Sequence, residues 1–389
     1  MAKTVVSRQY LKDCSISGVV ILDLPAQHRV PLSWLHEHAC PSILLRTATD
    51  ILPTHYTSSA DIAALRSEVI EYRNVKYLNR RQWQNGSWSG NMLGIGPMKS
   101  AGIKDVGTVA QYRRLLELGV PINQRAYKLA DRLFFKVLSR DETPSLWFEY
   151  QKGAAENPEL KVWARSFLRE GVTCALAHAG RVEDPRVRGS AHRVISDVSQ
   201  FLRSEVAESP LTKKGSKYLL EPGAYPPSIF SVAMLSYMPR LQRERAGFVE
   251  RLGRFLATPP QSDNWSIQIG KKSLKSTFHI LGDPLKADSK GNTDDIPWSL
   301  HWIELIVRLG LLDVAPTAQR ILARLLQDCD EQGTWNPKNL RTLPKSRSKL
   351  ADFAFPLEVD GKTQDRRRVD VTFRLALIAK LAGWDLEIV

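Results

Sequence analysis

Apolar residues recur at three- and four-residue spacings along most of the chain from about residue 31 onward. A half-buried sheet would instead show alternation with a period of two, and no such segment is long enough here. The pattern therefore predicts an all-α protein. The clearest helical ranges are 160–179, 187–202, 248–256, 298–312, 318–326 and 371–381.

The connections between these helical ranges alternate in length. Short connections are expected at 179–183, 239–243 and 311–315, and long ones, rich in Gly, Pro and Lys, at 205–228, 258–296 and 329–368. A short connection makes two helices an antiparallel hairpin. If such hairpins stand side by side, the long connections fall on one end of the molecule, and long loops usually carry function. We expect a site at that end.

The net charge favours an anionic partner. Fifty-five Lys and Arg residues against 41 Asp and Glu residues give a formal charge of +14. An excess of this size speeds encounters with polyanions and suits ligands that bear phosphate. The alternative is that the basic surface serves solubility alone.

Length, apolar runs and cysteines bound the organisation of the chain. We expect an extended arm over residues 1–30, including the short apolar run 17–24, and a single domain over 31–389. No apolar run approaches the ~20 residues that cross a bilayer. The four cysteines form no CxxC motif, which favours free thiols in a reducing, cytoplasmic setting. The sequence predicts no metal site and no cofactor.

The segment 73–88 carries the strongest local motif. Arg73, Tyr77, Gln82, Gly86 and Trp88 stand at spacings that predict a helix, a tight glycine turn and a Trp folded back onto the helix. The Gln side chain is expected to bond the backbone at the start of the next helix. A weaker copy comprises Arg320, Leu325, Cys329, Gly333 and Trp335, which indicates internal repetition.

The motif is similar to the QW repeat of terpene cyclases, and the chain resembles the terpenoid cyclase/protein prenyltransferase superfamily. Segments 32–46 and 371–384 also resemble bacterial prenyltransferase-like proteins of uncharacterised role. The resemblance spans residues 31–384 and implies an α/α-toroid, a ring of about six antiparallel helical hairpins with long loops on one end. It implies no particular function, because toroids host unrelated activities.

Class II terpene cyclases protonate their substrate with the middle Asp of a DxDD motif. The nearest match here is 292–295, in which Asp294 would correspond to the general acid, Asp295 to the last Asp, and Asn292 replaces the first. The simpler interpretation is that these carboxylates cap the helix that begins near Pro297. No residues match the zinc site of protein prenyltransferases.

Two cationic segments lie in the long connections. Spaced cations with hydroxyl and amide groups suit phosphate oxygens, and nearby aromatic rings can stack on bases. The alternative is a solvated loop face. The candidate phosphate-binding residues are Lys271, Lys272, Lys275, His279, Lys338, Asn339, Arg341, Lys345 and Arg347, and the candidate stacking residues are Trp265, Phe278 and Trp335.

Three functions remain open from the sequence. The first is nucleic-acid binding or processing, with Asp283, Asp294 or Asp295 acting in hydrolysis. The second is an isoprenoid diphosphate enzyme with Asp294 as the acid. The third is a non-catalytic scaffold that binds another protein. The sequence decides neither whether the protein is an enzyme nor its oligomeric state.

Overall fold

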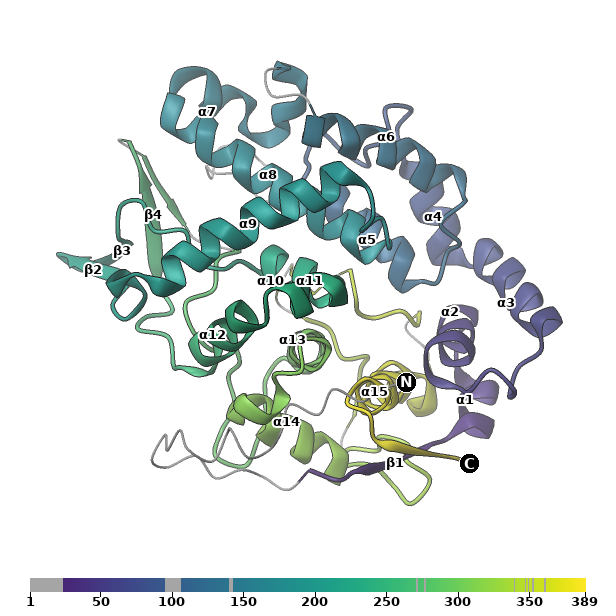
Figure 1. The fold of residues 1–389 in the computed structure, drawn as a ribbon. Coiled ribbons are helices and arrows are strands. Elements are labelled where there is room, and N and C mark those ends of the chain that lie inside the picture. Colours follow the sequence, from purple (N-terminus) through teal and green to yellow (C-terminus); the bar gives the residue numbers. More distant parts are fainter. Residues whose placement is uncertain are drawn as a thin grey trace.

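Helices dominate the structure, a computed structural model (Figure 1), and make up 57% of it against 8% for strands. It describes residues 24–94, 106–139, 143–270, 272–275, 278–338, 340–346, 348, 350–351, 353–359 and 362–389. The helices are α1 Leu32–His38, α2 Pro41–Arg46, α3 Ser59–Glu71, α4 Arg73–Arg81, α5 Gly107–Glu117, α6 Arg125–Ser139, α7 Gln151–Glu156, α8 Pro158–His178, α9 Pro185–Arg203, α10 Ile229–Ser236, α11 Pro239–Glu244, α12 Ala246–Ala257, α13 Ile296–Arg308, α14 Pro316–Gln327 and α15 Gln364–Leu381. The strands are β1 Gln27–Val30, β2 Leu211–Lys214, β3 Lys217–Leu220, β4 Trp265–Ile269, β5 Lys272–Lys275 and β6 Asp385–Ile388.

The helices begin where sequence signals place them. Asn157 and Asp184 cap α8 and α9 by accepting hydrogen bonds from first-turn N–H groups, and each is followed by a proline. Gly180 and Gly310 follow the ends of α8 and α13 with positive φ. Within the described ranges, no helix combines the length and the apolar character that a bilayer crossing requires. All six helical ranges expected from periodicity are confirmed.

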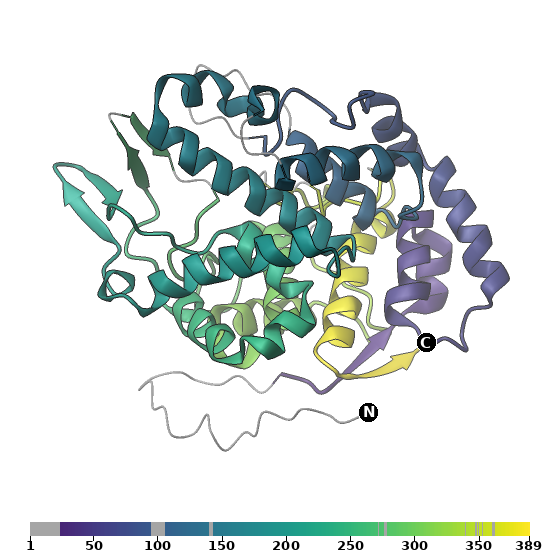
Figure 2. The ribbon, with the colours of Figure 1, turned by 45° about the horizontal axis from the view of Figure 1, so that its top comes forward.

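Six helices, which we call the inner helices, contact one another in a circuit: α2, α5, α8, α10, α13 and α15. Successive members contact from α5 through to α15, and α15 contacts the π-helical turn Thr47–Ile51 that continues α2. The circuit returns to α5 through Arg46 of α2, whose Nη1 lies 2.5 Å from Glu117 Oε2. In Figure 1, α3, α6 and α14 lie farther out, and Figure 2 shows the same fold turned by 45°.

Short connections follow the inner helices, and long ones precede most of them. The long connections before α5, α13 and α15 bring residues 93–94, 278, 350 and 353 to one pocket. Ser346 Oγ also donates to Asp295 Oδ2 at 2.9 Å, which joins the last two of these connections. One detail differs from expectation: residues 239–243 form helix α11, because Pro239 starts a new turn two residues after α10 ends.

Two small sheets correct the expectation of an all-α fold. β1 pairs in parallel with β6, which joins the two ends of the described chain. β2, β3, β4 and β5 form a second sheet in that order, built from the two long connections before α10 and α13. Each strand has only four or five residues and the second sheet is rich in exposed Lys; only β4 alternates clearly, and five residues are a short pattern from which to predict a sheet.

One tight turn recurs three times in the described residues, at Gly86, Gly291 and Gly333. In each copy the glycine N–H bonds the carbonyl three residues earlier, and that residue's N–H bonds the carbonyl just after the glycine. The three φ angles are +94°, +85° and +87°. Two copies continue with a tryptophan, and Trp88 and Trp335 each donate their backbone N–H to a threonine hydroxyl of the following inner helix. The turn at Gly291 was not expected.

One of the two contacts expected for the first motif is confirmed, and the other goes to a different helix. Gln82 Nε2 donates to the carbonyl of Ala126 at 2.8 Å, in the first turn of α6 rather than of α5, the next helix along the chain. The indole Nε1 of Trp88 donates to the carbonyl of Leu78 at 2.9 Å, so the ring folds back onto α4. The repeated turn therefore ties each helix to the next hairpin.

Candidate functional site

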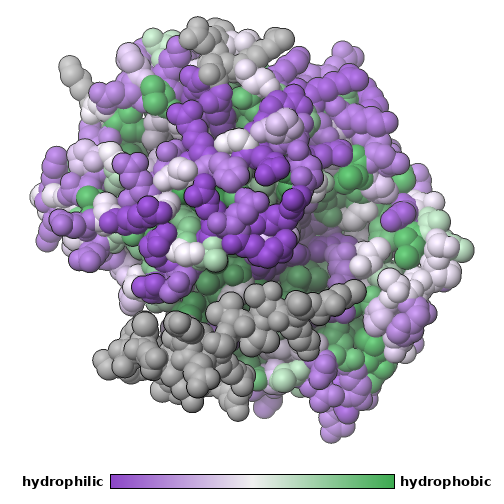
Figure 3. All heavy atoms as spheres, in the orientation of Figure 1, coloured by the Kyte–Doolittle hydropathy of each residue, from purple (hydrophilic) through white to green (hydrophobic). Residues whose placement is uncertain are grey.

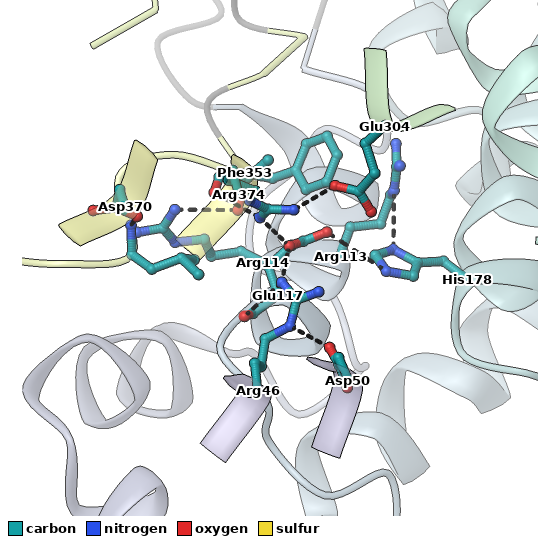
Figure 4. A network of polar contacts seen from close by, with 12 residues as sticks. Arg46, Asp50, Arg113, Arg114, Glu117, His178, Glu304, Phe353, Asp370 and Arg374 are labelled. Carbon is teal, nitrogen blue, oxygen red and sulfur yellow. Dashed lines mark hydrogen bonds and ion pairs between the residues drawn. The ribbon is translucent and has the colours of Figure 1, made fainter. Parts of the chain in front are cut away.

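A buried network of charged side chains occupies the place where the inner helices meet (Figure 4). Arg374 of α15 is fully buried and bonds both Glu117 of α5 and Glu304 of α13, the latter at 2.5 Å. Arg46 shares the same oxygen of Glu117, and Arg308 bonds Glu304 at 2.9 Å. Buried charges persist only when paired in this way.

The arginines keep both carboxylates ionised. Burial alone would raise the pKa of Glu117, but the charges of Arg374 and Arg46 hold it well below its usual value of 4.5. Burial acts likewise on Glu304, and Arg374 and Arg308 lower its pKa to about 2. The centre of the molecule is therefore filled by ion pairs rather than by an open cavity.

Arg113 extends this network through a histidine. Burial lowers the pKa of His178 well below 6.5, so its ring is neutral near pH 7. Its Nδ1 accepts a hydrogen bond from Arg113 Nε at 3.4 Å, and its Nε2 lies 3.6 Å from Glu117 Oε1. The histidine thereby connects Arg113 to the carboxylate without a direct ion pair.

Arg113 itself has no carboxylate partner among the described residues. Its side chain is 2% exposed, and its Nη2 is buried without a hydrogen-bond acceptor. The guanidinium lies over the ring of Phe353, with Cζ 3.9 Å from the ring centroid. A cation–π contact offsets part of the cost of burying a charge, but it does not supply an anion.

Arg113 lines a narrow pocket of about 20 Å³ beneath the meeting point of the long connections. The other walls are mostly apolar, with Leu93, Phe278, Leu350 and Phe353 coming from three of those connections. The N-terminal residues of α5 and α10 also line it. Helix N-termini carry partial positive charge, so the pocket combines an apolar wall with a positive potential. We call it the axial pocket.

The segment 353–359 covers the axial pocket and is fastened by charged groups. Arg114 Nη1 donates to the carbonyl of Phe353 at 3.1 Å, and Nη2 donates to that of Pro356. The backbone N–H groups of Leu357 and Glu358 donate to the buried carboxylate of Asp370 at 2.7 and 3.0 Å. These bonds hold Phe353 over Arg113.

The three candidate catalytic carboxylates do not line the axial pocket. Asp294 is exposed at the surface. Asp295 caps α13, with Oδ1 accepting from the Trp298 N–H at 3.0 Å, as the simpler interpretation expected. Asp283 is partly buried, which raises its pKa, and it accepts from the Leu285 N–H at 2.9 Å. The structure brings none of them beside Arg113.

The candidate phosphate-binding residues divide into two places. Lys338, Arg341 and Lys345 are exposed on the connection between α14 and α15. Lys275 is exposed on β5, the outer strand of the four-stranded sheet. Lys271, Asn339, Arg347 and the side chain of Lys272 lie outside the described residues.

His279 and the candidate stacking rings are packed inside the protein. His279 stacks on Phe167 at a centroid distance of 4.9 Å, and burial lowers its pKa to about 4. Phe278 lines the axial pocket, whereas Trp265 and Trp335 are buried, the latter 1% exposed. Neither indole presents a face on which a base could stack in this conformation.

The central network was not foreseen, although the sequence contains a signal for it. Arg374 interrupts the apolar run 371–379, and Glu304 interrupts the run 302–307. A lone charge in a helix that is apolar all round indicates a buried, paired side chain. Arg113 and Glu117 carry no such signal, because α5 is amphipathic and contains other polar residues near them.

Comparisons with known proteins leave the site without a precedent. No protein-family model, no curated protein and no solved structure matches the chain. Across the described ranges, no group of three His, Cys, Asp or Glu side chains is arranged to hold a metal ion.

Proposed function

We propose that this protein is an α/α-toroid whose loop-bearing end binds a phosphate-bearing ligand, with Arg113 as the buried cation that reaches it. The circuit of inner helices supports the toroid, since each member except α15 leads through a short connection to a further helix. The turns at Gly86, Gly291 and Gly333 support it as well, because one device recurs between successive hairpins.

The observation that carries the ligand proposal is the unbalanced charge of Arg113. Its neighbours Arg46, Arg308 and Arg374 each bond a carboxylate, and Arg113 bonds only a neutral histidine. An unpaired buried charge costs several kcal/mol, roughly, so its retention favours a bound anion as the missing partner. Outward movement of Phe353 would open the pocket to such an anion.

Nucleic acid is the ligand class that the surface charge favours. Lys338, Arg341 and Lys345 lie on the same connection as Phe353 and have exposed side chains. Together with the net charge of +14 they suit a chain of phosphates. Contacts of this kind position a backbone and do not read its sequence.

An isoprenoid diphosphate is the second candidate, and the apolar walls of the axial pocket favour it. Leu93, Val109, Phe230 and Phe278 would contact a hydrocarbon chain while Arg113 met the diphosphate. Acid-initiated cyclisation by Asp294 is less consistent with the geometry, because that carboxylate is exposed and outside the pocket.

A salt-dependent titration tests the proposal. Labelled single-stranded DNA and RNA would be titrated with the protein by fluorescence anisotropy between 50 and 200 mM salt, roughly the range over which phosphate contacts weaken. We expect the triple variant Lys338→Gln/Arg341→Gln/Lys345→Gln to bind more weakly. The slope of log binding constant against log salt concentration should be shallower by about 2, because each phosphate contact on a single strand contributes ~0.7 to that slope.

The matched control removes three cations from the outer helix α6. Lys128, Arg132 and Lys136 are exposed, and their replacement by Gln changes the net charge equally. Equal weakening in both variants would reject the loop-bearing end as the site. Binding of farnesyl diphosphate that is lost in Arg113→Met, without nucleic-acid binding, would favour the second candidate. Binding of neither ligand would leave the protein-interaction scaffold.

A further inference from the structure

A groove runs between α9 and α12 on the outer face of the molecule, away from the axial pocket. Its volume is about 560 Å³, within the ~300–1,000 Å³ typical of small-molecule sites. Residues from the last turns of α9 form one wall, and residues around the start of α12 form the other. In Figure 3 hydrophilic residues gather over the part of the surface where α9 lies.

Three arginines line this groove without an ion-pair partner among the described residues: Arg203, Arg245 and Arg251. The groove contains one carboxylate, that of Glu244, which lies 3.9 Å from His192. Two nearby arginines differ, since Arg240 and Arg254 pair with glutamates at 3.0 and 2.7 Å. The lining of the groove therefore carries an excess of two positive charges.

A buried hydroxyl in the groove also lacks a partner. Ser199 is 8% exposed, and its Oγ makes no hydrogen bond. The neighbouring hydroxyls of Ser196 and Ser204 both bond backbone carbonyls of α9, at 2.8 and 2.7 Å. Ser199 lines the groove, and because buried polar groups in proteins are nearly always paired, its unused hydroxyl favours a missing ligand.

The start of α12 adds donors to the same place. α12 is 12 residues long, and its N-terminal residue in the groove is Ala246, followed by Gly247. A Cβ on Gly247 would lie 3.8 Å from Arg251 Nη1, so this guanidinium lies beside the first helical turn. Arg251 Nε is buried without an acceptor. First-turn amides and a guanidinium together make an anion-binding arrangement.

We propose that this groove binds the phosphomonoester group of a small phosphorylated molecule. A phosphomonoester carries about −1.5 to −2 charges at neutral pH, which matches the local excess of the groove. Arg203 and Arg251 bond its oxygens, Arg245 adds a third positive charge to the lining, and the Ser199 side chain turns to donate its hydroxyl. The bounded shape of the groove favours a small ligand over a polymer backbone. The inference is independent of the function proposed for the axial pocket.

Titration with inorganic phosphate tests the site on the full chain. Binding would be measured by calorimetry at constant ionic strength, with chloride as the reference anion. We expect Arg203→Gln/Arg251→Gln to weaken phosphate binding at least tenfold, since charge-assisted bonds are lost. The control Arg132→Gln/Lys136→Gln removes two exposed cations from α6 and should bind as the wild type does. Absence of binding to the wild type, or equal loss in both variants, would overturn the proposal.

Replacement of Ser199 by Ala separates a ligand contact from a structural role. The hydroxyl has no partner in the free protein, so Ser199→Ala should leave the thermal midpoint unchanged or raise it. Phosphate affinity should nevertheless fall several-fold. A lower midpoint with unchanged affinity would refute the role of Ser199. If single-stranded DNA displaced phosphate from the groove, the ligand would be a nucleic-acid backbone, and the small-molecule assignment would be wrong.

Discussion

At the scale of single residues, the centre of the protein depends on carboxylates that each serve two arginines. Glu117 accepts from both Arg46 and Arg374 through the same oxygen. A buried ion pair contributes little net stability when complete, but removing one partner leaves an uncompensated charge. Removal of one partner therefore lowers the stability of the fold by much more than the intact pair contributes to it.

Glu117→Gln should destabilise the protein by about 3–5 kcal/mol, because it removes one of the two carboxylates that each buried guanidinium contacts and leaves Arg46 with Asp50 and Arg374 with Glu304. Urea unfolding at pH 7 measures the change. The wild type should also lose stability as pH falls from 4.5 toward 2, since the depressed pKa of Glu117 makes protonation favour the unfolded chain. The variant should lose less over this range.

The matched control is Glu68→Gln, in which an exposed glutamate of α3 loses the same charge. Its stability should stay within about 0.5 kcal/mol of the wild type. A similarly small change in Glu117→Gln would mean that Asp50 and Glu304 balance Arg46 and Arg374 without Glu117, and the stabilising role proposed for Glu117 would be refuted.

At the scale of elements, the recurring turn depends on the missing side chain of its glycine. A Cβ on Gly86 would lie 2.3 Å from the carbonyl oxygen of Leu129 in α6. The corresponding distance is 2.3 Å from the Arg320 carbonyl oxygen for Gly291, and 2.1 Å from the Arg29 carbonyl oxygen for Gly333. Since these neighbours are backbone atoms, relief requires movement of a whole element.

Gly86→Ala should therefore lower the free energy of unfolding by more than the backbone strain at a positive φ would alone. Gly180→Ala is the comparison, because Gly180 has a φ of +73° and a Cβ at this position would meet no atom within 4 Å. We expect about 1–2 kcal/mol for Gly180→Ala from backbone strain, and a clearly larger loss for Gly86→Ala. Thermal or urea unfolding measures both. Equal losses would show that close approach to α6 contributes nothing.

Sequence periodicity located the helices because their apolar faces are long and regular. It missed β2 to β5 because strands of four or five residues in Lys-rich connections give patterns too short to stand out, even in β4, where apolar residues alternate with polar ones. The sequence placed the expected site at the long connections, and Phe278, one of the residues singled out there, lines the axial pocket, whose function stays a prediction. It was not predicted at Arg113, because the lack of a carboxylate beside this residue depends on contacts between segments distant in sequence.

At the scale of the whole molecule, the two ends of the described chain hold each other. β1 and β6 pair in parallel, and the Leu32 N–H donates to the carbonyl of the final residue, Val389, at 2.7 Å. α1 and α15, the helices next to these strands, also contact each other. If the inner helices form a closed toroid, this pair is the closure.

Deletion of residues 385–389 should open the closure and loosen the elements on either side of it more than those opposite. The ladder bonds of β6 are lost, each worth about 1 kcal/mol. Hydrogen exchange should therefore accelerate in β1, α1 and α15 and change little in α8.

Asp385→Ala/Glu387→Ala keeps the backbone bonds and should exchange like the wild type. In a closed circuit strain is shared among all members, whereas in an open stack it is not. Equal acceleration of exchange in α8 and α15 would therefore mean that closure stabilises the whole ring cooperatively. No acceleration beyond β1 would mean that the strand pair is a local attachment, and the closed toroid would lose its main support.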